Sequence, residues 1–219
     1  MVAAPDDLDL TATEARVLGA LLEKELTTPE SYPLTLNALT AACNQTSNRD
    51  PVVRYESQLV ETTMLVLKGK GLARVVHPGS GERATKYRQV ADEALKLEPG
   101  PRAVVCVLLL RGPQTVAELK TRTERMHRFA SGEIESVLDA LSRRDPALVA
   151  RVDRLPGQKE DRWIQLLEAK ADERAAATAP ARVTPTGREA GRVEELEDRV
   201  AALEARVAAL AEALGDSVG

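Results

Sequence analysis

The chain has 219 residues, of which 43% are hydrophobic and 2% aromatic, and its formal net charge at pH 7 is -4. This length and hydrophobic fraction are typical of one large or two small globular domains, whose cores must be built from Leu, Val and Ala. The scarcity of aromatic rings argues against binding of single-stranded nucleic acid by base stacking, and the acidic balance argues against a generally basic nucleic-acid binder.

Two features of the sequence predict the cellular location of the protein. The first ten residues are acidic and contain no apolar signal region. The apolar run at residues 103–110 is far shorter than the roughly 20 residues that span a bilayer. We therefore expect a cytoplasmic protein without membrane contact. Cys43 and Cys106 both lie in apolar patterns and are expected to be buried hydrophobic residues rather than disulfide or metal-binding residues.

The first predicted helix begins at a capping box, with Thr11 as N-cap and Glu14 three residues later, and it runs to about Lys24. The Thr-Pro pair at Pro29 resists further helix. A short second helix is predicted over residues 36–43, because its apolar residues recur at helical spacing. Each helix is therefore expected to turn one apolar face toward a core.

A polar turn rich in amide side chains, residues 44–49, follows the second helix. Asp50 is a good N-cap acceptor, and Pro51 suits the first helical position, where its missing N–H costs nothing. We predict a third helix that starts at Pro51 and is stopped by Gly69 and Gly71. Five of its apolar residues are expected to face a core: Val52, Leu59, Val60, Met64 and Leu67. A short helix, a turn and a longer helix is the layout of a helix-turn-helix.

A hairpin is predicted after the third helix. Residues 72–76 are short and β-branched, residues 78–81 form a Pro-Gly-Ser-Gly turn, and residues 83–88 return as the second strand. Three helices followed by a two-stranded hairpin make a winged helix.

The same order of elements returns after an interruption at residues 95–101. A buried helix over residues 102–110 comes first, and a second capping box, Thr115 with Glu118, opens a short helix. Ser131 is the expected N-cap of a longer helix. The second half of the chain is therefore expected to repeat the three helices of the first.

A second hairpin is predicted from residues 149–152 and 162–166. Ala-Arg-Val at residues 73–75 matches Ala-Arg-Val at residues 150–152, and Lys86-Tyr87 matches Arg162-Trp163. These matches indicate an internal tandem repeat.

The last part of the chain has a different composition. Residues 168–190 are rich in Ala, Glu, Arg, Thr and Pro and are predicted to be a linker. Beyond it, apolar residues recur with alternating spacings of 3 and 4, which predicts a coiled-coil seam: Val193, Leu196, Val200, Leu203, Val207, Leu210 and Leu214. Valine at most a positions and leucine at the d positions favour two parallel strands, so we expect a homodimer through this helix.

The fold class expected from these elements is mainly α with small β-hairpins (α+β). The expected parts are an N-terminal tail (1–10), a winged-helix domain (11–92), a second winged-helix domain (93–167), the linker (168–190) and the coiled-coil helix (191–215).

The stretch EKELTTPESYPLTLNAL at residues 23–39, continued by ACNQ at 42–45 and SNRDP at 47–51, resembles the YceH family of bacterial proteins. The match continues through TKY at 85–87 and LLRGPQT at 109–115 and covers about residues 10–167. The resemblance implies two winged-helix domains per chain, in agreement with the repeat.

The amide-rich turn is the sharpest candidate site for double-stranded DNA. In a helix-turn-helix the N-terminus of the second helix points at base edges, and Asn, Gln and Arg are the side chains that pair with adenine or guanine. Cations of the first hairpin could follow a phosphate backbone, and a basic cluster in the second copy could meet phosphates or an acidic protein. The candidate DNA-contacting residues are Asn48, Arg49, Arg54, Arg83, Lys86, Arg88, Arg122 and Arg125.

An alternative interpretation of the same turn is structural. Asn44 would cap the second helix, Asn48 and Asp50 would satisfy backbone N–H groups, and Arg49 would pair with a nearby carboxylate. Glu56 and Glu61 on the following helix support this alternative, because acidic side chains repel phosphate.

Two functions are left open. The first is a non-enzymatic DNA-binding transcriptional regulator, and the second is a protein-protein interaction adaptor that uses winged-helix domains without DNA. Catalytic, cofactor and metal sites are not expected, because the chain has no Gly-rich phosphate loop, no His-Glu-x-x-His and no Gly-x-Ser-x-Gly motif.

Overall fold

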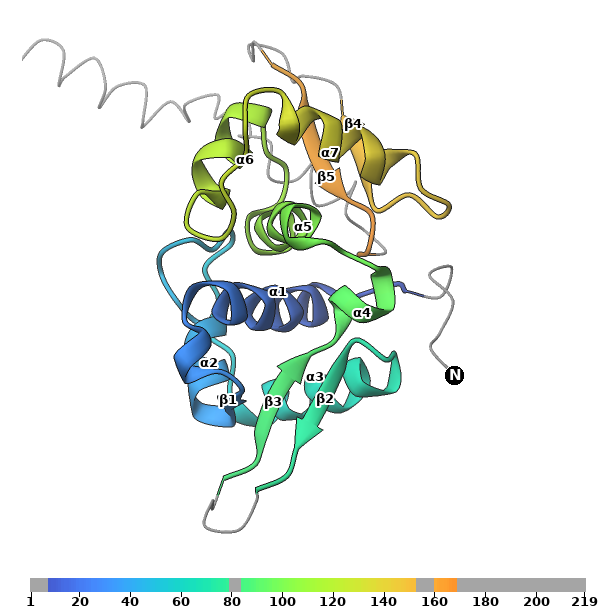
Figure 1. Ribbon diagram of the computed structural model, residues 1–219. Helices are drawn as coiled ribbons and strands as arrows, with labels where there is room; N and C mark the ends of the chain where they lie inside the picture. The colour runs from blue at the N-terminus through green and yellow to red at the C-terminus, as the bar shows by residue number, and fades with distance from the viewer. Residues whose placement is uncertain (1–7, 79–83, 153–159, 169–219) are drawn as a thin grey trace, which may run out of the picture. The chain divides into compact units, whose positions relative to one another are not determined.

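The computed structural model describes residues 8–78, 84–152 and 160–168, and this part of the chain is a mixed α+β structure with small antiparallel sheets (Figure 1). All of these residues belong to one compact unit, residues 1–179. A first copy of the repeat comprises α1 (Ala12–Thr27), η2 (Pro29–Ser31), β1 (Leu34–Thr35), α2 (Leu36–Cys43), α3 (Ser57–Gly69), β2 (Ala73–Val76) and β3 (Lys86–Gln89). After α4 (Ala91–Leu95), a second copy comprises α5 (Pro99–Arg111), α6 (Val116–Thr123), α7 (Glu133–Ser142), β4 (Val149–Val152) and β5 (Arg162–Gln165).

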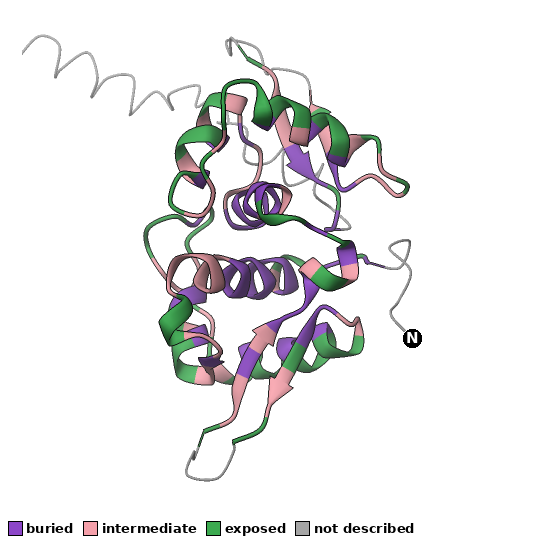
Figure 2. Cartoon of the chain, in the orientation of Figure 1, coloured by how far each residue is buried: buried purple, intermediate pink, exposed green. Residues whose placement is uncertain are grey.

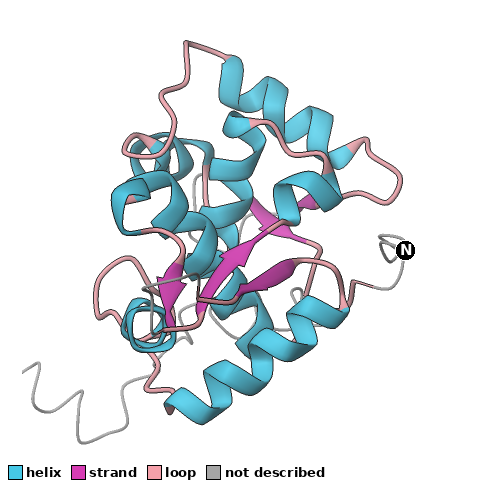
Figure 3. Ribbon diagram, turned by 60° about the horizontal axis from the view of Figure 1, so that its bottom comes forward, coloured by secondary structure: helices cyan, strands magenta, loops and turns pink. Residues whose placement is uncertain are grey.

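The predicted starts of the first two helices are confirmed. The Thr11 hydroxyl accepts from the Glu14 N–H at 3.2 Å, while the Glu14 carboxylate accepts from the Thr11 N–H at 2.8 Å. This reciprocal pair satisfies two N–H groups that the helix itself leaves unbonded. The predicted bounds of α2 are also confirmed, and the hydroxyl of Thr35 caps it. The predicted hairpin is present as β2 and β3, and β1 extends it to a sheet of order β1-β3-β2 (Figure 3).

The predicted start of the third helix at Pro51 is wrong, because α3 begins only at Ser57. Hydrogen bonds from distant parts of the chain hold the preceding segment in a non-helical path. The N–H of Asp50 donates to the carbonyl of Leu110 at 2.9 Å, and the buried guanidinium of Arg16 donates to the carbonyl of Pro51 at 2.6 Å. Tertiary hydrogen bonds therefore outweigh the local capping signal.

In the second copy the capping box of α6 is confirmed, since Thr115 and Glu118 form both reciprocal bonds. The assignment of Ser131 as an N-cap is wrong. Gly132 occupies the cap position with φ 75°, a left-handed conformation that glycine adopts without steric cost. The carboxylate of Glu133 accepts from the Ala130 N–H at 2.7 Å and closes the turn that leads into the helix.

The internal repeat can be followed residue by residue in the strand pairing. Leu34 pairs with Tyr87 in the first copy, and Gln114 pairs with Trp163 in the second. However, the two Ala-Arg-Val sequences are offset by one residue when the two hairpins are aligned by their strand pairing. Ala73 pairs with Gln89 and Val149 pairs with Gln165, so the structural equivalent of Ala73 is Val149 and not the alanine that follows it.

The last residue of each hairpin is a buried glutamine that performs the same task in both copies. The side-chain oxygen of Gln89 accepts from the N–H groups two and three residues further on, at 2.7 and 3.2 Å. The side-chain oxygen of Gln165 does the same at 2.7 and 3.0 Å. Each glutamine therefore ends its strand by satisfying two backbone donors at the turn.

The two copies meet through α1 and α5, which cross in the middle of the structure and are each buried along much of their length (Figure 2). A Cβ atom on Gly19 would lie 2.9 Å from the side chain of Leu110, so only glycine permits this close approach. The thiol of Cys106 lies 3.5 Å from the carbonyl oxygen of Gly19. One hydrophobic core therefore runs through both copies.

Candidate functional site

Residues 44–56, here called the 44–56 connection, join α2 to α3 in place of the expected tight turn. Asn44 holds its two ends together. Its side-chain amide donates to the carbonyl of Tyr55 at 2.8 Å and accepts from the Tyr55 N–H at 2.7 Å. The connection is therefore a closed loop with a fixed base, and Asn44 acts structurally, as the alternative interpretation expected.

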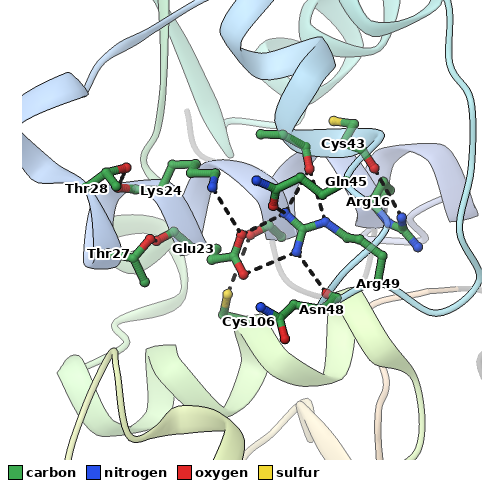
Figure 4. Close-up of polar contacts among 12 residues, drawn as sticks. Arg16, Glu23, Lys24, Thr27, Thr28, Cys43, Gln45, Asn48, Arg49 and Cys106 are labelled. Atoms are coloured by element: carbon green, nitrogen blue, oxygen red, sulfur yellow. Dashed lines mark hydrogen bonds and ion pairs between the residues drawn. The ribbon is translucent and has the colours of Figure 1, made fainter.

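Arg49 points into the protein rather than toward solvent (Figure 4). Its side chain is 0% exposed and pairs with Glu23 of α1 through two nitrogen-oxygen contacts of 2.7 and 3.2 Å. The same guanidinium donates to the carbonyl of Ala42 and to the side chain of Gln45. All of its donor nitrogens are bonded inside the molecule, so we no longer assign Arg49 a DNA contact. The structural interpretation of this residue is confirmed.

The other two candidates of the connection lie on the surface. Asn48 is exposed, adopts a positive φ of 59°, and accepts a hydrogen bond on its side-chain oxygen from Nη2 of Arg111. Arg54 is exposed, and within the described residues it forms no ion pair. Of the three residues predicted here, only Arg54 offers a free cation.

The outward face of α3 mixes polar residues with three exposed large apolar side chains. Leu59, Leu65 and Val66 are 44%, 59% and 42% exposed, and Val52 of the connection is 52% exposed. The expectation that Val52 and Leu59 face the core is therefore wrong. A helix start at Ser57 leaves Val52 outside the helix, and Val60, Met64 and Leu67 alone form its buried stripe. The outward residues of α3 are Gln58, Leu59, Glu61, Thr62, Leu65, Val66, Lys68 and Gly69.

The equivalent helix of the second copy, α7, has an outward face of a different kind. Glu133, Glu135 and Asp139 are exposed on it, and Arg143 forms an ion pair with Asp139 at 3.3 Å. This face is acidic and exposes no large apolar side chain, whereas the outward face of α3 exposes two leucines and a valine among polar residues. Neither helix has the run of basic and amide side chains with which a recognition helix contacts bases.

Two cations of the first hairpin share one carboxylate. Arg88 lies 3.5 Å and Arg74 3.3 Å from the carboxylate of Glu93. Lys86 is half-buried on β3, and the predicted contact residue Arg83 lies outside the described residues.

In the second copy Arg122 forms an ion pair with Glu118 at 3.4 Å. Arg125 is exposed and, in the described part of the chain, has no hydrogen-bond or ion-pair partner. The structure brings Asn48, Arg122 and Arg125 together, since all three line one cavity between the copies.

Two arginines that the sequence analysis did not single out support these features. Arg16, 2% exposed, bonds the carbonyls of Cys43 and Pro51, and Arg111 bonds Asn48. A lone arginine among the apolar residues of the first helix was the available signal for Arg16, because a buried cation must have a structural partner. No local pattern distinguishes Arg111.

Cys43 and Cys106 are buried, as predicted. Burial raises the pKa of the Cys43 thiol to about 12, and burial also raises the pKa of Cys106. Thiols of this kind are almost fully protonated at neutral pH, which makes them poor nucleophiles. Among the described residues there is no group of three or more His, Cys, Asp or Glu side chains arranged to hold a metal ion, and no helix there is long and apolar enough to cross a bilayer.

The coiled-coil seam predicted at residues 193–214 lies outside the described residues. The dimer expected from it is therefore carried forward as a proposal.

Comparison with known proteins identifies relatives along most of the chain. A UPF0502 protein of Geotalea daltonii is 51% identical over 175 residues, which is 80% of this chain and 79% of that protein. A UPF0502 protein of Shewanella piezotolerans is 43% identical over 208 residues, which is 93% of this chain and 94% of that protein. The family model described as "Protein of unknown function, DUF480" matches residues 10–158. The chain therefore belongs to the DUF480 family of bacterial proteins, whose members carry the name UPF0502.

Proposed function

We propose that this protein is a non-enzymatic adaptor, in which two tandem winged-helix domains bind another protein and the outward face of α3 is the docking surface. The order of elements supports the winged-helix assignment. Each copy runs helix, short β segment, helix, helix and hairpin, with the short β segment paired to the second strand of the hairpin.

The observation that carries the proposal is the composition of α3. In a DNA-binding winged helix the helix at this place enters the major groove and contacts base edges with polar and basic side chains. Here that helix exposes Leu59, Leu65 and Val66. Leu59 and Val66 stand seven residues apart on one side of the helix, and Leu65 is the most exposed of the three. Exposed apolar side chains on a helix are typical of a protein interface, because removing them from water on binding is favourable.

The surroundings of this face indicate the chemistry of the partner. Glu56 precedes α3 and Glu61 lies beside the apolar residues, and both are exposed. A segment with apolar side chains flanked by lysine or arginine would complement the face in shape and charge. We therefore propose such a segment of another protein as the occupant.

A photo-crosslinking amino acid at position 65 tests the proposal in cells, with the exposed position 143 at the C-terminal cap of α7 as the matched control. We expect a discrete protein adduct from position 65 and none from position 143. Glu61→Lys should weaken the adduct, and Val66→Glu should abolish it. Equal labelling at both positions, or adducts only with nucleic acid, would contradict the proposal.

Binding to double-stranded DNA is the second candidate, favoured by Arg54 and Arg125, which are exposed and form no ion pair with any residue that the structure describes. A protein that binds phosphates releases counterions, so its affinity for duplex should fall steeply with added salt. Fluorescence anisotropy with random duplex distinguishes the two functions. If the protein binds DNA, the double variant Arg54→Glu/Arg125→Glu should lose most of the affinity for duplex. If it is an adaptor, neither the unchanged protein nor the double variant should bind duplex at moderate salt.

A homodimer through residues 192–214 is part of the proposal and depends on the sequence pattern alone. Arg192 and Arg199 stand at g positions and Glu197 and Glu204 at e positions, so parallel pairing sets opposite charges together. Sedimentation of the full chain and of a chain ending near Ala190 tests it. A monomeric full chain at tens of micromolar, or a shortened chain that dimerises equally well, would contradict the dimer.

A further inference from the structure

A cavity of about 330 Å³ lies where the two copies meet. One wall comes from the end of α1 and from Asn48 of the 44–56 connection, and the other comes from α5, α6 and the residues after α6. A volume of this size is at the lower end of the range for small-molecule sites, which is about 300–1,000 Å³. The cavity can therefore hold a small organic molecule but not a folded partner.

Three guanidinium groups line this cavity: those of Arg111 at the end of α5, Arg122 on α6, and Arg125 just beyond α6. Burial lowers the pKa of Arg111, and the neighbouring cations of Arg122 and Arg49 lower it further. Repulsion of this kind means that positive charge is concentrated here beyond what the nearby carboxylates offset. Asp50 and Glu23 act in the opposite direction on Arg111, with smaller effect.

The carboxylates near the cavity are already engaged. Glu23 is one of the lining residues, but both of its oxygens accept from Arg49. Glu118 is shared, since it lies 3.4 Å from Arg122 and 3.9 Å from Arg162 and also accepts from the Thr115 N–H. Arg125, by contrast, has no partner among the described residues. The cavity therefore has cationic groups whose charge is not fully met by the protein.

The remaining lining residues define what else the ligand must carry. Asn48 uses its side-chain oxygen to accept from Arg111, so its amide N–H groups are left as donors at the cavity wall. Val107, Leu110 and Met126 supply an apolar wall. The site combines donors for an oxyanion with an apolar surface, which is the usual composition of a small-ligand site.

We propose that this cavity binds a small organic anion, in which a carboxylate or phosphate group meets Arg111, Arg122 and Arg125 and an apolar body lies against Val107, Leu110 and Met126. Because its walls belong to both copies, the ligand would stabilise their contact. It would also hold Asn48, and with it the connection that leads to α3. The inference does not depend on the adaptor function, since it rests on a different surface.

Titration calorimetry on the full chain tests the site with three probes: phenyl phosphate, inorganic phosphate and phenol. Phenyl phosphate carries both the anion and the apolar body, so we expect it to bind with one site per chain and more tightly than inorganic phosphate, while phenol should not bind. Arg125→Ala should weaken phenyl phosphate by about tenfold or more, the usual effect of losing a charge-assisted hydrogen bond. Arg125 is exposed and unpartnered, so this variant is expected to fold normally.

Arg143→Ala is the matched control, because Arg143 is an exposed arginine at the C-terminal cap of α7 and does not line the cavity. It should bind phenyl phosphate as the unchanged protein does. Failure of both phosphate probes to bind at millimolar concentration would overturn the proposal, as would equal binding by Arg125→Ala. A duplex that binds through Arg125 while phenyl phosphate does not would identify the cluster as a contact for a nucleic-acid backbone and overturn the small-ligand site.

Discussion

The two copies of the repeat share their internal supports but differ on their surfaces. A threonine caps α2 and α6 at equivalent places, and a buried glutamine ends the hairpin in each copy. The outward faces of the third helices are unlike, however, since α3 exposes leucine and valine while α7 exposes glutamate and aspartate. The threonines and glutamines that bond the backbone are therefore present in both copies, whereas the exposed side chains of the third helices differ. This difference favours a separate function for each copy.

The connection between the second and third helices also differs between the copies. In the first copy it is built around Arg49, whose side chain is 0% exposed and pairs with Glu23. In the second copy the corresponding segment packs His127 and Phe129 against each other, with ring centroids 4.6 Å apart, and Gly100 of α5 leaves room for them. A buried ion pair in one copy is therefore replaced by ring packing in the other.

The largest expected effect is that of Arg49→Ala. Removing one partner of a buried ion pair leaves the other without compensation, which costs about 3–5 kcal/mol. Glu23 and the carbonyl of Ala42 would lose their donors, so we expect the free energy of unfolding to fall by about this amount in urea titration. Arg125→Ala, an exposed arginine, should change it by less than about 0.5 kcal/mol. A loss below about 1 kcal/mol for Arg49→Ala would mean that its ion pair does not support the connection.

Leu39→Ala and Leu119→Ala test whether the two copies contribute equally to one core. Leu39 of α2 and Leu119 of α6 stand at the same distance after their capping threonines, and both are 0% exposed. Truncating a buried leucine typically costs about 2–5 kcal/mol. Because α1 and α5 share a core, we expect each variant to unfold in a single transition with a lowered urea midpoint. Two separate transitions in either variant would indicate that the copies fold independently.

The sequence predicted correctly those features that depend on residues close together in the chain, and it failed where distant residues determine the structure. The capping boxes at Thr11 and Thr115 were correctly located, because each is a hydrogen-bond pattern completed within four residues. The helix start at Pro51 failed, since Asp50 donates to a carbonyl of α5 that is distant in sequence. The same limit applied to the candidate site, because whether Arg49 faces solvent or Glu23 is decided by the packing of α1.

Gln89→Ala and Gln165→Ala should have similar, intermediate effects if the repeated glutamine has one role. Each change leaves two backbone N–H groups without their acceptor in a buried setting, and unsatisfied buried groups cost about 1–3 kcal/mol. Gln89 also donates to Glu25 at 2.5 Å, and Gln165 donates to Glu168 at 3.2 Å. We expect thermal unfolding to shift downward in both variants. If only one variant lost stability, the two glutamines would be equivalent in their geometry but not in their contribution to stability.

The smallest expected difference separates the two capping threonines. Thr115 forms a complete capping box with Glu118, whereas the hydroxyl of Thr35 only accepts from the N–H of Ala38, at 3.3 Å. Replacing a threonine cap by alanine costs about 0.5–2 kcal/mol. Thr115→Ala should fall in the upper part of this range, because it leaves the N–H of Glu118 without its acceptor in a partly buried setting. Thr35→Ala should fall in the lower part, since the hydrogen bond that the Thr35 hydroxyl accepts from the Ala38 N–H is long and exposed. Urea titration of the two single variants, with Thr121→Ala as an exposed control on α6, measures the difference directly. An equal or larger loss in Thr35→Ala would mean that partial burial of the Thr115 cap adds nothing to its contribution.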